Sequence, residues 1–207
     1  MDWPLRALCS SKPPQSRLLD LPAELRTYIF ELVVTSDKYL VTFRLDKYQQ
    51  DTHQEATQPA LTRVSKQLRR ESLLLFYTAN TFVLHSEGAK AEEGHKWARC
   101  NERYLTEMTS LVIWQRFVTL TNARSESNGA LEVSLQRPKA GERWRVGDHW
   151  RWVTVTRKPS GVSLDAGFIM GSLRRLVADN PALLDSADDL YSTISDLKNL
   201  YVKEKMS

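Results

Sequence analysis

The sequence predicts an α+β fold, with helices at both ends of the chain and a central, mostly antiparallel sheet between them. Apolar residues recur at helical spacing near the N-terminus and again near the C-terminus. The middle of the chain instead alternates β-branched and aromatic runs with turn residues. Hydrophobic residues make up 42% of the 207 residues, which is enough for a substantial core. No internal repeat divides the chain, so we expect one domain over residues 18–207 after a flexible, Pro- and Ser-rich lead-in at residues 1–17.

The first helix is expected within LLDLPAELRTYIFELVV, residues 18–34. Pro22 suits the first turn of a helix, and Glu24 is favourable beside the positive helix start. One apolar stripe follows at helical spacing, formed by Leu25, Ile29, Leu32 and Val33. Such a stripe either packs into the core or binds a partner, and the pattern alone leaves both alternatives open.

A strand, a polar loop and a second helix come next. YLVTFRL, residues 39–45, is typical of a strand, and residues 46–58 form a polar loop. The pattern then predicts one long helix over residues 59–78, which Asn80 ends before a strand at residues 81–85. Its apolar face is formed by Leu61, Val64, Leu68, Ser72, Leu75 and Phe76.

The middle of the chain is expected to be rich in strands. Residues 86–96 resemble a loop and residues 97–108 a short helix, and a strand follows at residues 110–120. Asn128-Gly129 is a strong turn signal before a further strand. The segment ERWRVGDHWRWVTVTRK indicates a hairpin that turns near Gly147-Asp148.

Two helices are expected at the C-terminal end. The first has an apolar stripe of Ile169, Leu173, Leu176 and Val177, and the second has one of Leu190, Ile194, Leu197 and Tyr201. Asn180-Pro181 separates them, and Ser186 with Asp189 forms a capping pair for the second.

Charge and cysteine content exclude several classes of protein. A formal charge of +4 does not indicate a generally cationic nucleic-acid binder. Cys9 and Cys100 form neither a disulfide framework nor a four-ligand zinc pattern, which favours a reduced, intracellular location in the cytoplasm or nucleus. The sequence predicts neither a secretory leader nor a membrane-spanning helix.

No arrangement of residues indicates catalysis or a cofactor. The four histidines are scattered, and His95 with Cys100 supplies only two loosely spaced metal ligands. Nucleophile-elbow, phosphate-binding and His-Glu-x-x-His motifs are missing from the sequence. Single acids such as Glu71 and Asp165 need a partner and a pocket to act in catalysis. We therefore expect a non-enzymatic protein with no cofactor and no metal ion.

A basic, tryptophan-rich stretch at residues 137–158 is the best candidate for nucleic-acid contact. It has seven basic residues against two acidic ones, a local charge of +5. Indoles beside arginines can stack on bases while the charges meet phosphates. The candidate contacts are Arg143, Trp144, Arg145, Trp150, Arg151 and Trp152. A packed sheet with solvated arginines is the favoured alternative.

A second basic cluster lies on the helix expected over residues 59–78. Its members are Arg63, Lys66, Arg69 and Arg70, against the single acid Glu71. Three of the cations recur at steps of three and four residues, so they share a face away from the apolar stripe. This face is suited to an acidic partner or is a solvated outer surface.

Two ordered motifs together resemble the N-terminal pattern of a large group of fungal F-box-like proteins. The first motif is Leu-Pro, an acidic residue and Leu, at the start of an Ile- or Tyr-rich helix. The second is Arg-Val-x-x-Gln-Leu-Arg-x-Glu, followed by Phe-Tyr and Asn-Thr-Phe. The matching residues are Leu21, Pro22, Glu24, Leu25, Arg26, Ile29 and Leu32, then Pro59, Leu61, Arg63, Val64, Gln67, Leu68, Arg69, Glu71, Phe76, Tyr77, Asn80, Thr81 and Phe82. The resemblance covers about residues 18–84.

The resemblance implies a substrate adaptor for ubiquitin ligation. F-box proteins dock through N-terminal helices onto the Skp-type adaptor of a cullin-RING ubiquitin ligase, while the C-terminal region presents a substrate. On this basis Leu21, Pro22, Leu25 and Ile29 would form an apolar docking surface of the helix-in-groove type. The alternatives are an interaction domain with no ligase role, and motifs that serve packing alone.

Overall fold

The computed structural model describes residues 17–46, 49–117, 129–153, 158–180, 182 and 185–207. Helices and a six-stranded mixed sheet make up this part of the chain, so the α+β class is confirmed. Nearly all of the flexible lead-in expected at residues 1–17 lies outside the described residues. Within them, no helix is both long and apolar enough to cross a membrane.

Helices and strands are interspersed up to β4, after which three strands in a row are followed by two helices. In order they are α1 Ala23–Val34, β1 Tyr39–Val41, β2 His53–Glu55, η2 Ala60–Arg63, α2 Lys66–Ala79, β3 Thr81–His85, α3 Gly88–Cys100, η3 Glu102–Glu107, β4 Ser110–Arg116, β5 Ala130–Gln136, β6 Arg145–Val153, α4 Val162–Asp179 and α5 Ala187–Met206. Here η marks a 3₁₀ helix.

The sheet has the strand order β2-β1-β3-β4-β5-β6. The pairs β1–β2, β1–β3 and β3–β4 are parallel, whereas β4–β5 and β5–β6 are antiparallel. The expectation of a mostly antiparallel sheet is therefore corrected to a mixed one. The physical reason is that α2 and α3 act as crossovers before β3 and β4, and a helical crossover returns the chain parallel to its starting strand.

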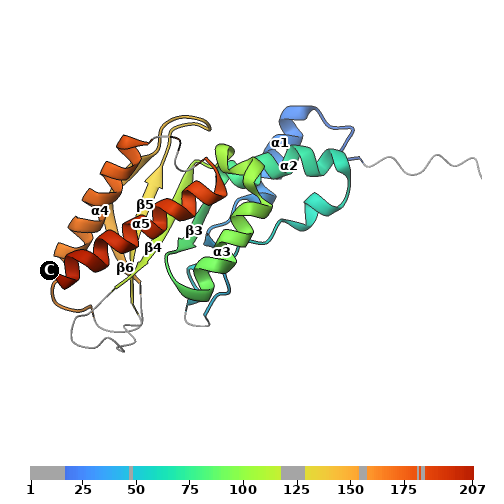
Figure 1. Ribbon diagram of the computed structural model, residues 1–207. Coiled ribbons are helices and arrows are strands. Elements are labelled where there is room, and N and C mark those ends of the chain that lie inside the picture. The colour runs from blue at the N-terminus through green and yellow to red at the C-terminus, as the bar shows by residue number, and fades with distance from the viewer. Residues whose placement is uncertain (1–16, 47–48, 118–128, 154–157, 181, 183–184) are drawn as a thin grey trace, which may run out of the picture.

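One face of the sheet is covered by α3, α4 and α5 (Figure 1). The main core lies between this face of the sheet and the helices. There the apolar stripes of α4 and α5 pack against alternate residues of the strands. Fully buried members include Leu84, Ile113, Leu131, Leu173 and Leu197. The stripes expected on the C-terminal helices are confirmed in this core, since Ile169, Leu173, Val177, Leu190, Ile194, Leu197 and Tyr201 are all buried.

The opposite face of the sheet is concave. The guanidinium of Arg151 in β6 lies 5.3 Å from the ring centre of Tyr39 in β1, although three strands separate them. In a flat sheet, four strand spacings would place these strands roughly 19 Å apart. Long side chains cover part of that distance, and curvature of the sheet supplies the rest. The concave face encloses a second apolar cluster of Val41, Phe43, Val83, Val112, Trp114 and Ala130.

The long helix predicted over residues 59–78 is wrong as a continuous element. The chain forms the short η2, and α2 starts anew after Ser65, whose backbone is extended. The Ser65 hydroxyl accepts a hydrogen bond from the Leu68 amide at 3.2 Å, which caps α2. Serine competes with helical backbone bonding in this way, so it favours a cap over a helix interior. Val64 consequently points to solvent.

Several other segments differ from expectation. The polar loop expected at residues 46–58 contains the strand β2, and the short helix expected at residues 97–108 is divided between the end of α3 and η3. Residues 86–96, expected as a loop, belong mostly to α3, where buried Gly94 lets the helix approach Tyr191. The hairpin expected at Gly147-Asp148 is a single strand, β6, which pairs with β5 on both sides of that step. The glycine is needed there for close packing, because a Cβ on Gly147 would collide with Ser134.

Several boundaries were predicted correctly. The strand at residues 81–85 is β3, and Asn80 ends α2. Ser186 caps α5, because its hydroxyl accepts from the Asp189 amide at 3.1 Å. Asn128 of the predicted Asn-Gly turn lies outside the described residues.

Candidate functional site

Helix α1 lies beside α2, at the end of the molecule away from α4 (Figure 1). It begins directly after Pro22, whose carbonyl accepts the first helical hydrogen bond, from the Arg26 amide at 3.1 Å. Phe30 and Val34 are its buried residues. One side of α1 therefore holds it on the domain.

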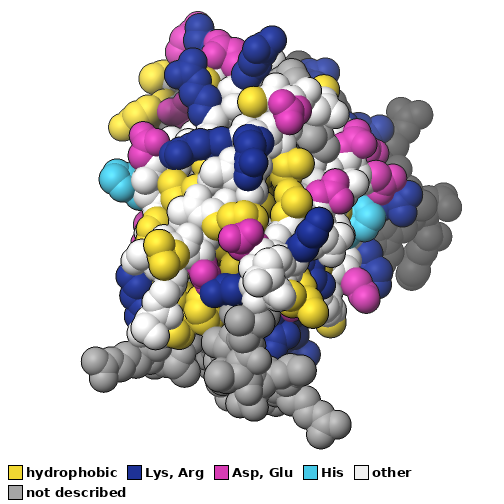
Figure 2. All heavy atoms as spheres, turned by 60° about the vertical axis from the view of Figure 1, so that its left-hand side comes forward, with side chains coloured by type: hydrophobic (Ala, Val, Ile, Leu, Met, Phe, Trp, Pro, Cys, Tyr) yellow, Lys and Arg dark blue, Asp and Glu magenta, His cyan; other side chains and the backbone are white. Residues whose placement is uncertain are grey.

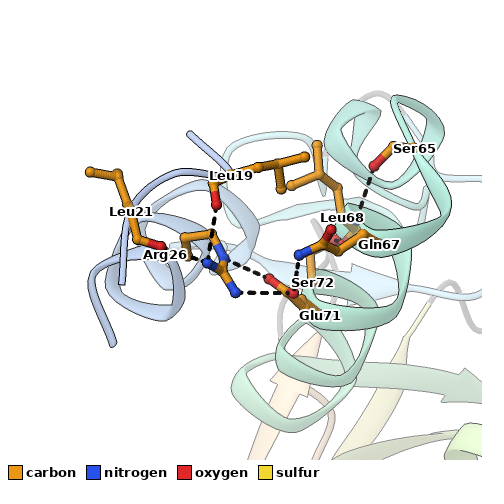
Figure 3. A network of polar contacts seen from close by, with 8 residues as sticks. All are labelled: Leu19, Leu21, Arg26, Ser65, Gln67, Leu68, Glu71 and Ser72. Atoms are coloured by element: carbon orange, nitrogen blue, oxygen red, sulfur yellow. Dashed lines mark hydrogen bonds and ion pairs between the residues drawn. The ribbon is translucent and has the colours of Figure 1, made fainter. Parts of the chain in front are cut away.

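An ion pair joins α1 to α2. Arg26 donates through Nε to Glu71 Oε2 at 3.0 Å and through Nη2 to Oε1 at 3.3 Å. Its Nη1 also donates to the Leu21 carbonyl at 2.6 Å, and Gln67 donates to Glu71 Oε1 at 3.0 Å (Figure 3). The hydrogen bonds from Arg26 and Gln67 lower the pKa of Glu71. This network fixes the start of α1, including the Leu-Pro step.

Asn80 fixes the other end of α1. Its Nδ2 donates to the Val34 carbonyl at 2.9 Å and to the Phe76 carbonyl at 2.8 Å. Its Oδ1 accepts from the Ser36 amide at 2.7 Å. The side chain thus satisfies carbonyls at the ends of two helices at once. Arg26, Glu71 and Asn80 of the two motifs are structural residues that hold α1 against α2.

The outer side of α1 is an exposed apolar stripe. Leu25 is 52% exposed, Tyr28 61%, Leu32 68% and Val33 56%. Leu25, Tyr28 and Leu32 stand at positions i, i+3 and i+7, so they follow one line along the helix. We call these four residues the α1 stripe.

The predicted docking residues lie at or beside the α1 stripe. Pro22 and Leu25 are exposed, while Leu21 and Ile29 are half-buried. Sequence reasoning missed Tyr28, and it left open whether Leu32 and Val33 pack inward. The spacing of Leu25, Tyr28 and Leu32 was the available signal.

The basic cluster expected on the second helix lies entirely on the surface. Arg63, Lys66, Arg69 and Arg70 are all exposed. Glu71 is the only acid of α2, and Arg26 already binds it. Within the described part of the chain, none of the four cations forms an ion pair. Arg63 ends η2 and the other three lie on α2; we call the four together the α2 cations.

The tryptophan-rich stretch does not form one surface. Trp144 is only 3% exposed and lies 4.4 Å beneath the guanidinium of Arg137, which donates to the Leu105 and Met108 carbonyls. Trp150 and Trp152 pack against the main core on the helix-covered side. Lys158 lies 4.2 Å from the centre of the Trp150 ring, so this stretch does bring cations and indoles together, but its indoles pack inward and form no common exposed stacking surface.

The arginines of this stretch also point in different directions. Arg151 donates to Glu132 at 2.8 Å on the concave face of the sheet, whereas Arg143 and Arg145 line a depression beside α4. Figure 2, seen from the α4 side of Figure 1, shows Lys and Arg interspersed with Asp, Glu and hydrophobic side chains. This face lacks the continuous positive field that phosphate contact favours.

Acidic groups at two surface depressions are engaged in structural contacts. In a depression of about 490 Å³ beside β1 and β2, Glu93 accepts from the Arg44 amide and Glu55 from the Leu45 amide. On the concave face, a depression of about 380 Å³ contains Glu132, which accepts from Trp114 and Arg151. The absence of enzymatic activity stays a prediction.

The other candidate polar residues also have structural partners. Asp165 accepts from the Tyr201 hydroxyl and the Lys205 ammonium, each at 2.6 Å. His95 pairs with Asp188 at 2.8 Å, and Cys100 is exposed. Among the residues described, no three acidic, histidine or cysteine side chains gather to hold a metal ion.

Comparison of the chain with models of protein families, with curated proteins and with solved structures gives no match. The function is therefore argued from the geometry of α1 and α2 and from the motifs that these helices carry.

Proposed function

We propose that this chain is a non-enzymatic interaction domain that docks through the α1 stripe, and that its partner is the Skp-type adaptor of a cullin-RING ubiquitin ligase. The observation that carries the proposal is the exposure of Leu25, Tyr28, Leu32 and Val33, each more than half exposed on one short helix. The motif resemblance supplies the identity of the partner.

Such a stripe is costly unless a partner covers it. Single exposed apolar residues are normal on a protein surface, but a contiguous apolar patch marks an interaction site. Burying one leucine stabilises a complex by roughly 1.5–3 kcal/mol. A line of anchors at i, i+3 and i+7 is the form in which a helix fills an apolar groove.

The attachment of α1 favours docking as a preformed element. The Arg26–Glu71 pair and the Asn80 hydrogen bonds hold both ends of the helix while its outer side stays free. A preorganised helix loses little conformational entropy on binding, which raises affinity. The sheet with α3, α4 and α5 extends away from α1 and would present the substrate (Figure 1).

Co-purification with a Skp-type adaptor tests the proposal. We expect the native chain to bind, and Leu25→Asp and Leu32→Asp each to weaken binding by at least about tenfold, as for anchor residues in interfaces. Leu164→Asp is the matched control, because Leu164 is 81% exposed on α4, at the other end of the molecule. All variants should keep the native thermal transition. Equal binding by native and α1-stripe variants would reject the docking surface.

A further inference from the structure

The α2 cations lie on η2 and α2, and α2 packs against α1, the helix that carries the α1 stripe. Lys66, Arg70 and Leu74 follow one another at steps of four residues, so they line one face of α2. Leu74 is also exposed, which makes this face both basic and apolar. Arg70 is adjacent in the chain to Glu71, the residue that joins α2 to α1. Both surfaces therefore belong to the same pair of helices.

Among the described residues, none of the α2 cations forms an ion pair with a carboxylate. Some other exposed cations do form ion pairs, for example Arg99 with Asp188 and Arg174 with Asp148. The single carboxylate of α2, Glu71, is bound by Arg26 and also interacts with Arg70. The four cations outnumber this one acid, so a net positive charge remains on η2 and α2. Positive charges placed beside an apolar docking surface attract a negatively charged partner surface.

We infer that the partner of the α1 stripe presents an acidic surface next to its apolar groove, and that the α2 cations steer its association. This inference rests on the proposed docking function and adds the charge of the partner's surface. A protein is favoured over a nucleic acid because the neighbouring stripe is largely aliphatic. Phosphates and sugars offer no apolar groove for Leu25 and Leu32, and the indole of Trp144 is buried.

The two surfaces have separable kinetic effects. Exposed charges act mainly on the association rate constant and are screened by salt, because the partners feel them before contact. Buried apolar anchors act mainly on the dissociation rate constant. Replacement of α2 cations should thus slow association, whereas replacement of stripe residues should speed dissociation.

The test measures the binding kinetics of the full chain with a purified Skp-type adaptor at several salt concentrations. The double variant Lys66→Glu/Arg70→Glu should lower the association rate constant by about tenfold at low salt and leave dissociation nearly unchanged. Added salt should remove most of the difference between it and the native chain. Lys139→Glu/Lys203→Glu changes the net charge equally at exposed positions outside α1 and α2, so it should behave as the native chain does.

The possible results distinguish failure of the steering inference from failure of the proposed docking function. If Leu25→Asp weakens binding but the α2 double variant associates at the native rate, the steering inference fails and the docking function stands. If the native chain does not bind the adaptor, both fail. A third outcome assigns the α2 cations to nucleic-acid contact and overturns the inference. In that case a duplex DNA or RNA column retains the native chain but not the α2 double variant, while both chains associate with the adaptor at the same rate.

Discussion

Arg26 of α1 and Glu71 of α2, which are 45 positions apart in the sequence, form a two-bonded ion pair across the contact between their helices. Both side chains are mostly buried, and Arg26 also binds the Leu21 carbonyl. The pair therefore connects the Leu-Pro step of the first motif to the basic helix of the second.

Glu71→Ala should loosen α1. The change leaves the guanidinium of Arg26 without its carboxylate, so we expect the free energy of unfolding to fall by about 1–2 kcal/mol. Urea denaturation followed by circular dichroism measures the loss. Glu31→Ala is the control, since Glu31 is exposed on α1 outside its first turn. Equal stability of Glu71→Ala and the native chain would show that packing of Phe30 and Val34 suffices to hold α1.

Asn80→Ala removes three hydrogen bonds at once. It leaves the Val34 and Phe76 carbonyls and the Ser36 amide without their partner, and unmade buried hydrogen bonds are costly. We expect a loss of about 2–3 kcal/mol in the free energy of unfolding. Asn199→Ala, at an exposed position of α5, should change it little. A loss no larger than that of the control would contradict the role given to Asn80.

Stability should fall in mild acid because of His85. Burial lowers its pKa to about 4, and nearby Lys90 adds to the effect. The unfolded chain binds a proton at the ordinary pKa near 6.5, so the native state loses stability as the pH falls from about 6.5 toward 4. We expect about 2–3 kcal/mol from this group over that range.

His85→Gln tests the origin of this pH dependence. Glutamine retains an acceptor for the Glu87 amide, which His85 Nδ1 binds at 3.1 Å, and it does not titrate. The difference in melting temperature between pH 7 and pH 4.5 should shrink in the variant. The pKa of His53 is also lowered by burial, so a part of the dependence should remain. An identical profile in the native chain and the variant would exclude His85 as a source.

Gly94→Ala should be strongly destabilising although alanine favours helices. Its Cβ would collide with the hydroxyl of Tyr191, a residue of α5, so the Tyr191 side chain or α3 would have to shift. We expect the free energy of unfolding to fall by about 2 kcal/mol, in the range of overpacked cores.

Gly171→Ala is the opposite case, because nothing lies within 4 Å of a Cβ placed at this position in the middle of α4. It should raise the free energy of unfolding by about 0.5–1 kcal/mol. Thermal denaturation of the two variants measures both effects.

Prediction from the sequence was most accurate for elements whose apolar residues all face the same core. In α5, Leu190, Ile194, Leu197 and Tyr201 are buried as the helical spacing indicated. Local capping chemistry was also visible at Ser186. In contrast, the break at Ser65 was missed, because apolar residues continue at helical spacing on both sides of it. The small residue Gly94 gave no signal, since its role depends on Tyr191 far along the chain.

At the candidate site, the sequence did not reveal which side of α1 is exposed. Helix α1 is apolar on two sides, with Phe30 and Val34 on one and Leu25, Tyr28 and Leu32 on the other. Helical periodicity in the sequence indicated a single stripe of Leu25, Ile29, Leu32 and Val33, and it did not decide which side of the helix α2 covers. That choice is accompanied by the Arg26–Glu71 pair, whose two residues are 45 positions apart in the sequence. The orientation of α1 is set by contacts between distant residues.

Helix α1 is attached chiefly through one side, which makes it an independent opening unit. Segments with few buried contacts unfold locally at a small fraction of the global free energy, and their amide hydrogens exchange early. The amides of α1 should therefore exchange with deuterium before those of β4 and β5 in the centre of the sheet. A bound partner would slow that exchange, so occupancy of the α1 stripe could be followed in the intact chain without replacing a residue.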